Sequence, residues 1–81
     1  MVNEGVTVFE RGIRAVVDQF DLSVPEERAR AFLLAATLVS TVPDDASRLA
    51  WAGWASRLVG VDVFVMLEKV DCLISRRFRR P

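Results

Sequence analysis

Residues 31–39 read AFLLAATLV, nine residues without a charged side chain in the middle of an 81-residue chain. The segment lies within a helical pattern, so its apolar side chains would point all the way round the helix axis. One neighbouring helix covers only one side of such a surface. We therefore expect the segment to be wrapped by the rest of a very small fold, or to be covered in part by another protein chain.

The chain is small for the apolar content that it carries. Its 81 residues form a single helical domain, residues 1–81, and 52% of them are apolar. A domain of this size buries only about 60% of the surface that its unfolded chain exposes. Some large apolar side chains therefore remain on the surface unless another chain covers them. This predicts a homodimer or a complex with a larger protein.

Two similar segments predict helix N-termini on either side of this apolar run. They are SVPEE at residues 23–27 and TVPDD at residues 41–45. Each offers a hydroxyl cap, a proline suited to the first helical turn, and two acids that complement the positive end of the helix dipole. Pro43 also ends the preceding helix, because the residue before a proline disfavours the helical region.

Two further helix starts and one helix end follow from the same kind of signal. Thr7 with Glu10 forms a capping box, Asp62 can cap in the same way, and Gly60 is suited to ending the helix before it. The rival interpretation of residues 61–65 is a short β-branched strand, but it has no convincing partner strand.

Hydrophobic periodicity agrees with these helix starts and ends. The predicted fold is all-α, a compact four-helix bundle with connections of about two to four residues. The predicted helices cover about residues 7–21, 24–41, 44–58 and 62–79.

The third predicted helix carries two stripes of different character. Small residues recur at Ala46, Ala50 and Gly53. A glycine inside a helix costs about 1 kcal/mol relative to alanine, and its usual role is to let another backbone approach closely. Ala50 and Gly53 therefore predict a tight crossing against the second helix.

The other stripe contains Trp51, Trp54 and Leu58. Tryptophan is enriched at the centres of protein–protein interfaces, although it is also a common core residue. We expect the leftover apolar surface to lie on the third and fourth helices. The candidate interface residues are therefore Trp51, Trp54, Leu58 and Phe64, and core packing of at least one tryptophan is the alternative.

The chain lacks residues that several common kinds of catalytic and binding site require. The chain has no histidine, no tyrosine, one lysine and one cysteine, and its four glycines are scattered. A Ser-His-Asp triad, a zinc site and a phosphate-binding loop are therefore excluded. We predict that the chain is not an enzyme and has no cofactor or metal.

A few remaining groups admit a functional and a structural interpretation. The acid pairs at residues 26–27 and 44–45 could hold a hard cation, but helix-start electrostatics explains them better. Glu68 and Asp71 share one helix face, where solvation or ion pairing is favoured over a site. Cys72 lies in an apolar helix and is interpreted as a small core residue rather than a reactive thiol.

The last residues, 76–81, form a basic C-terminal tail. It contains Arg76, Arg77, Arg79 and Arg80 and no acid, whereas residues 1–71 hold seven basic and eleven acidic side chains. The tail could contact nucleic-acid phosphates or an acidic protein surface. It could also simply complement the helix dipole and be solvated.

The start of the chain lacks the basic and apolar segments of a signal peptide, and no stretch is long enough to span a membrane. With a single cysteine, this predicts a cytoplasmic protein. The predicted function is a non-catalytic protein–protein interaction module, homodimeric, acting as a small regulatory adaptor or as an inhibitor of a larger protein. The alternative is a small nucleic-acid-associated regulator that contacts phosphates through the Arg76–Arg80 tail.

Overall fold

The chain folds into four α-helices joined by short connections. The computed structural model describes the backbone of residues 4–78 and the side chains of residues 8–76. The helices are α1 Glu4–Asp18, α2 Pro25–Val39, α3 Asp45–Val59 and α4 Val63–Phe78. The predicted all-α four-helix fold is confirmed. The alternative strand at residues 61–65 is wrong, because the backbone is helical from Val63 onward.

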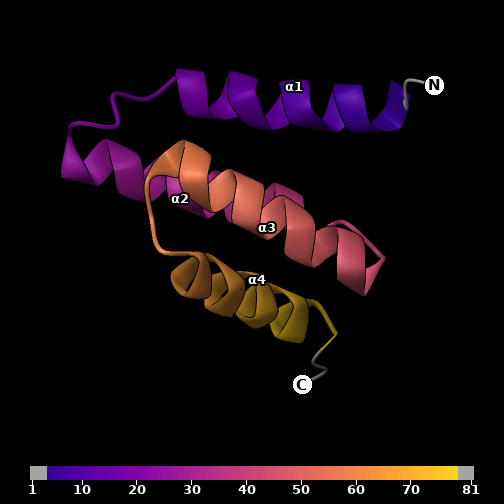
Figure 1. Cartoon of the computed structure of the whole chain (residues 1–81). Coiled ribbons are helices and arrows are strands. Elements are labelled where there is room, and N and C mark those ends of the chain that lie inside the picture. The colour runs from indigo at the N-terminus through magenta and orange to yellow at the C-terminus, as the bar shows by residue number, and fades with distance from the viewer. Residues whose placement is uncertain (1–3, 79–81) are drawn as a thin grey trace.

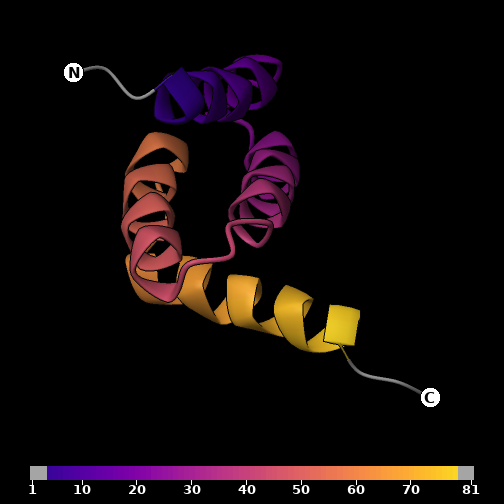
Figure 2. The ribbon, with the colours of Figure 1, turned by 90° about the vertical axis from the view of Figure 1, so that its right-hand side faces the viewer.

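The helices are arranged in three layers around a central pair (Figures 1 and 2). α2 and α3 lie side by side, and each of them contacts all three other helices. α1 covers one side of the pair and α4 crosses the opposite side, as Figure 2 shows. Within the described part of the chain, α1 and α4 do not contact each other. The α2–α3 pair therefore carries the packing of the whole domain.

The buried side chains of the two contacting helices α2 and α3 are mostly small, and we call this set the small-residue crossing. Alanine lets two helix backbones approach closely, and larger side chains of α1 and α4 then close the core from both sides. The crossing consists of the buried residues Ala31, Ala35, Ala36 and Val39 of α2 and Ala52, Ala55, Ser56 and Val59 of α3. The side chains that close it are Ile13, Val17, Met66 and Val70.

The tight crossing predicted at Ala50 and Gly53 is wrong. Ala50 is exposed. A Cβ atom placed on Gly53 would meet only the Arg57 side chain, 3.9 Å away. The buried face of α3 instead contains Ala52 and Ala55, which lie on a different side of the helix.

The apolar run at residues 31–39 is covered by its own chain on only part of its circumference. Three alanines and Val39 are fully buried, and Phe32 and Leu38 are half-buried against the core. On the outer side, Leu33 and Leu34 stay 44% and 42% exposed. Large apolar side chains are therefore left on α2 as well as on α3 and α4, where Leu49, Phe64 and Val65 are exposed.

The N-termini of α2 and α3 differ in detail from the predicted hydroxyl caps. Val24 occupies the cap position of α2 without a side-chain hydrogen bond, and the Ser23 hydroxyl donates instead to Asp21. Asp44 caps α3 by accepting a 2.8 Å hydrogen bond from the backbone N–H of Ser47. The predicted caps fail because Ser23 and Thr41 lie in connections 19–24 and 40–44, which are longer than expected.

The remaining helix ends divide between correct and incorrect predictions. Gly60 ends α3 in the left-handed conformation with φ 89°, and its N–H donates to the Ser56 carbonyl. Asp62 accepts a 2.7 Å hydrogen bond from the Phe64 N–H at the start of α4. The predicted start at Thr7 is wrong, because α1 already begins at Glu4. Thr7 is therefore the fourth residue of the helix and does not lie before its first turn.

The small-residue crossing leads to a stability prediction. Ala52→Leu adds three heavy atoms at a fully buried position of α3, and overpacking of this kind costs about 1–3 kcal/mol. Ala50→Leu, two residues earlier on the exposed side of α3, should change stability by no more than about 0.5 kcal/mol. Urea unfolding followed by circular dichroism measures both. Equal stability of the two variants would contradict the assigned buried face of α3.

The Asp44 cap leads to a pH prediction. The backbone N–H of Ser47, followed by the Ser47 side chain, lowers the pKa of the Asp44 carboxyl below its usual value. The folded pKa thus lies below the unfolded one, so this stabilisation is complete above the unfolded value and is lost as the pH falls through the folded value. Asp44→Asn keeps a capping oxygen but cannot ionise. The Tm difference between the native chain and Asp44→Asn should therefore shrink between pH 6 and pH 2, whereas parallel Tm curves would contradict this role.

Candidate functional site

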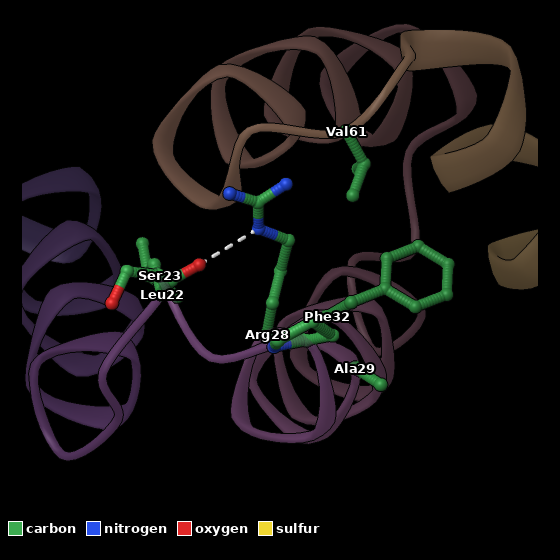
Figure 3. A pocket seen from close by; sticks show the side chains of 7 residues that line it. Leu22, Ser23, Arg28, Ala29, Phe32 and Val61 are labelled. Carbon is green, nitrogen blue, oxygen red and sulfur yellow. Dashed lines mark hydrogen bonds between the residues drawn. The ribbon is translucent and has the colours of Figure 1, made fainter.

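A hollow opens where the start of α2 meets two connections (Figure 3). It has a volume of about 530 Å³, which is in the range of binding pockets for small ligands or a few side chains. We call it the first hollow. Its walls come from the α1–α2 connection, the first two turns of α2 and the α3–α4 connection. The lining residues are Leu22, Ser23, Pro25, Arg28, Ala29, Phe32 and Val61.

Local structure explains why these residues converge. Pro25 begins α2, and helical spacing then places Arg28, Ala29 and Phe32 on the same side of the helix. Ala29 is small and leaves the space open above it. The Gly60 turn ends α3 and brings Val61 towards α2, with the Val61 N–H donating to the Ser56 carbonyl at 3.0 Å.

The connection before α2 is held in place by polar contacts of its own. The Glu27 carboxylate accepts a 2.7 Å hydrogen bond from the backbone N–H of Asp21. The Asp21 carboxylate accepts hydrogen bonds from the hydroxyl and the backbone N–H of Ser23, which lower the pKa of Asp21 below its usual value. Leu22, between them, is thereby fixed as the wall of the first hollow opposite Val61 (Figure 3).

Arg28 is the one charged side chain that lines the first hollow. Its Nε donates a 3.0 Å hydrogen bond to the Leu22 carbonyl. Figure 3 shows the guanidinium between Leu22 and Val61. Within the described residues, neither of its terminal nitrogens takes part in a hydrogen bond or an ion pair.

A second hollow of about 460 Å³ lies between α2 and α4 and shares Phe32 with the first. We call the two together the Phe32 groove. The second hollow combines an apolar base with a mixed-charge rim, and its lining residues are Phe32, Val65, Glu68, Lys69 and Cys72. Cys72 is exposed, so its interpretation as a core residue is wrong. The buried positions of α4 are Met66 and Val70, and Cys72 lies off that face.

The predicted interface residues are separated by the fold. Trp51 contacts Phe9 of α1 edge-on, with ring centroids 4.7 Å apart, and contacts Trp54 at 5.3 Å. The Arg14 guanidinium lies 5.3 Å from the Trp54 ring. Trp51, Trp54 and Leu58 are half-buried and pack against the core. The tryptophans thus attach α1 to α3, while Phe64 on α4 is 75% exposed.

The other predicted sites differ in how much of them the structure describes. Arg76 is exposed on the last turn of α4. The side chain of Arg77 and the whole of Arg79 and Arg80 lie outside the described residues. Among the acid pairs, Asp44 serves as a cap and Asp45 pairs with Arg48. The described part of the chain contains no group of three potential metal ligands.

None of the helices within residues 4–78 combines the length and the apolar content that a membrane span requires.

The Phe32 groove itself was not predicted from the sequence. A helical pattern could have placed Arg28, Ala29 and Phe32 on one side of α2. No local pattern, however, brings Val61 and Leu22 to that side, because the contact depends on how three layers pack.

The ring contacts predict that Trp51 contributes more to folding than to self-association. Trp51→Ala removes the ring contact with Phe9 of α1 and should lower the free energy of unfolding by about 2 kcal/mol or more. Val8→Ala is the control, because Val8 is on the same helix as Phe9 but largely exposed. Thermal unfolding and light scattering measure the effects. A Trp51→Ala variant with unchanged Tm but weaker self-association would show that Trp51 belongs to an interface.

Comparison with protein families gives a match over the middle of the chain. The family described as the DnaB-helicase binding domain of primase matches residues 13–63, more than half of the chain. The matched segment includes every lining residue of the first hollow, and it includes α2 and α3 completely. A search of the curated proteins and a search of the solved structures found no match.

Proposed function

The chain belongs to the family of DnaB-helicase binding domains of primase, and we propose from this membership that it binds a helicase of the DnaB type. A domain of this family is a protein–protein interaction module, which agrees with the class predicted from the sequence. The single observation that carries the proposal is the match over residues 13–63. Binding to a larger protein also accounts for apolar side chains that the chain leaves uncovered.

We place the helicase contact at the Phe32 groove. The first hollow lies entirely within the matched segment, and its lining is mainly apolar. Concave apolar surfaces of this kind accept the apolar face of a partner helix. Arg28 and Ala29 on this wall are exposed, whereas Leu22, Phe32 and Val61 also pack against the core. The exposed side chains are therefore able to bind without first disrupting the fold.

The proposed mechanism is binding alone. The small-residue crossing holds α2 against α3, so the walls of the groove are fixed before the partner arrives. Such preorganisation reduces the entropy lost on association. The chain then acts as an adaptor that occupies a surface of the helicase, and any regulation follows from that occupancy.

Three further predictions from the sequence are not supported by a specific observation: the homodimer, the inhibitory role and nucleic-acid binding. A homodimer and an inhibitory role stay predictions, although exposed Leu33, Leu34 and Phe64 offer apolar surface for a second chain. Nucleic-acid binding through the basic tail also stays a prediction, because most of that tail lies outside the described residues. Light scattering of the free chain tests the dimer directly.

The proposal predicts that filling the first hollow blocks the helicase. Ala29→Glu places a charged side chain in the apolar hollow and should weaken binding of the DnaB-type helicase from the same organism by about tenfold or more. Ala50→Glu is the matched control, because Ala50 is also an exposed alanine in the second turn of its helix. It should bind as the native chain does. Calorimetric titration of the full chain measures all three affinities.

A second measurement locates the contact independently of these variants. Cys72 is the single cysteine of the chain, and it is exposed in the second hollow. A helicase seated in the Phe32 groove should slow alkylation of this thiol. If the native chain does not bind the helicase, the proposed function is overturned. If it binds but Ala29→Glu binds equally well and Cys72 is not protected, the contact lies on another surface.

A further inference from the structure

The guanidinium of Arg28 has one partner in the chain and room for another. Its Nε donates a hydrogen bond to the Leu22 carbonyl, and this bond orients the group between Leu22 and Val61 (Figure 3). The two terminal nitrogens are left without a partner among the described residues. An arginine held in this way presents a preoriented pair of donors.

Two of the acids close to Arg28 in the sequence, Glu27 and Asp21, bind other groups. Glu27 accepts a hydrogen bond from the Asp21 backbone, and Asp21 accepts two from Ser23. The described ion pairs of the chain join Arg14 to Glu10 and Arg48 to Asp45, and neither includes Arg28. The chain therefore does not neutralise the one charge in the hollow.

This arrangement restricts what can cover the hollow. The other lining residues are mainly apolar, so a partner that fills the hollow removes water from the Arg28 guanidinium. Burying a charge without a partner is strongly unfavourable. A purely apolar segment would incur that full cost. A carboxylate next to an apolar side chain avoids it, because it can accept two hydrogen bonds from the guanidinium at once.

We infer that the first hollow recognises a helical segment of the helicase that carries an Asp or Glu about one turn from a large apolar residue. The apolar side chain enters between Leu22, Phe32 and Val61, and the carboxylate accepts hydrogen bonds from the terminal nitrogens of Arg28. Spacing of three or four residues brings both side chains to one face of the partner helix. This inference rests on the proposed helicase binding and specifies its chemistry.

A phosphate would also satisfy Arg28, but the remainder of the hollow does not suit one. Leu22, Ala29, Phe32 and Val61 present no donors from their side chains. A nucleic-acid backbone would leave this apolar surface covered by charge. A helix that carries both a carboxylate and an apolar side chain matches both Arg28 and the apolar lining of the hollow, and for that reason we favour it.

The test compares two arginines of α2 in calorimetric titrations with the full helicase. Arg28→Met keeps much of the apolar stem and removes the charge, and it should weaken binding about 10- to 100-fold. Arg30→Met removes the same charge two residues further on, on the opposite side of the helix, from an exposed residue. It should leave the affinity nearly unchanged. Arg28→Lys keeps the charge but loses the fork, so it should fall between Arg28→Met and the native chain.

Stability measurements separate recognition from the hydrogen bond to Leu22. Loss of that bond lowers the Tm of Arg28→Met and Arg28→Lys to a similar extent. A difference between their affinities for the helicase therefore reports recognition of an anionic group by the charge at this position. The salt dependence of binding should also be weaker for Arg28→Met than for Arg30→Met. An Arg28→Glu variant should regain affinity when the contacting acid of the helicase is changed to lysine.

The outcomes are distinct. Helicase binding by the native chain with no loss in Arg28→Met overturns this inference and leaves the proposed function intact. If Arg28→Met and Arg30→Met lose affinity equally, Arg28 contributes only through the overall charge of the domain. That result also overturns this inference. Binding of a short single-stranded DNA probe that requires Arg28 would replace the carboxylate by a phosphate. Absence of helicase binding by the native chain overturns both proposals.

Discussion

The small-residue crossing between α2 and α3 is the contact on which the rest of the fold depends. Ala35 and Ala36 of α2 belong to the same buried cluster as Ala52 and Ala55 of α3. Short side chains lose no rotamer freedom on burial and let the two backbones approach closely. They also contribute little volume, so the bulk of the core must come from outside the pair. This explains why α1 and α4 pack on opposite sides and insert longer side chains such as Ile13 and Met66.

The same crossing determines where the chain is left open. The buried alanines of α2 lie on one side of the helix. Phe32 lies on another side, next to α4 and the α3–α4 connection. There the half-buried side chain of Phe32 lines both hollows. Arg28 adds a fixed charge to a surface that is otherwise apolar. A surface with both properties can discriminate between partners, since an apolar match without an acceptor is penalised.

Local signals in the sequence predicted the elements better than their contacts. Periodicity and the residues Gly60 and Asp62 located the helices, because capping and left-handed turns depend on neighbouring atoms alone. The buried face of α3 was assigned wrongly since alanines occur all round that helix, and Ala50 is no different from Ala52 in composition. Cys72 was misplaced for a similar reason: α4 has apolar residues off its buried face, including Val65. The first hollow lay beyond prediction because Leu22 and Val61 meet α2 only through tertiary packing.

The walls of the first hollow come from three segments that are distant in the sequence, and this has a consequence for the energetics of the whole domain. The α1–α2 connection, α2 and the α3–α4 connection must all be in their native places for the hollow to exist. A partner that occupies it therefore binds the folded chain and not the unfolded one. By mass action, every tenfold excess of free partner over its Kd adds about 1.4 kcal/mol to the free energy of unfolding. For a domain of this size, whose own stability is small, the bound state would be the form that best resists unfolding and proteolysis.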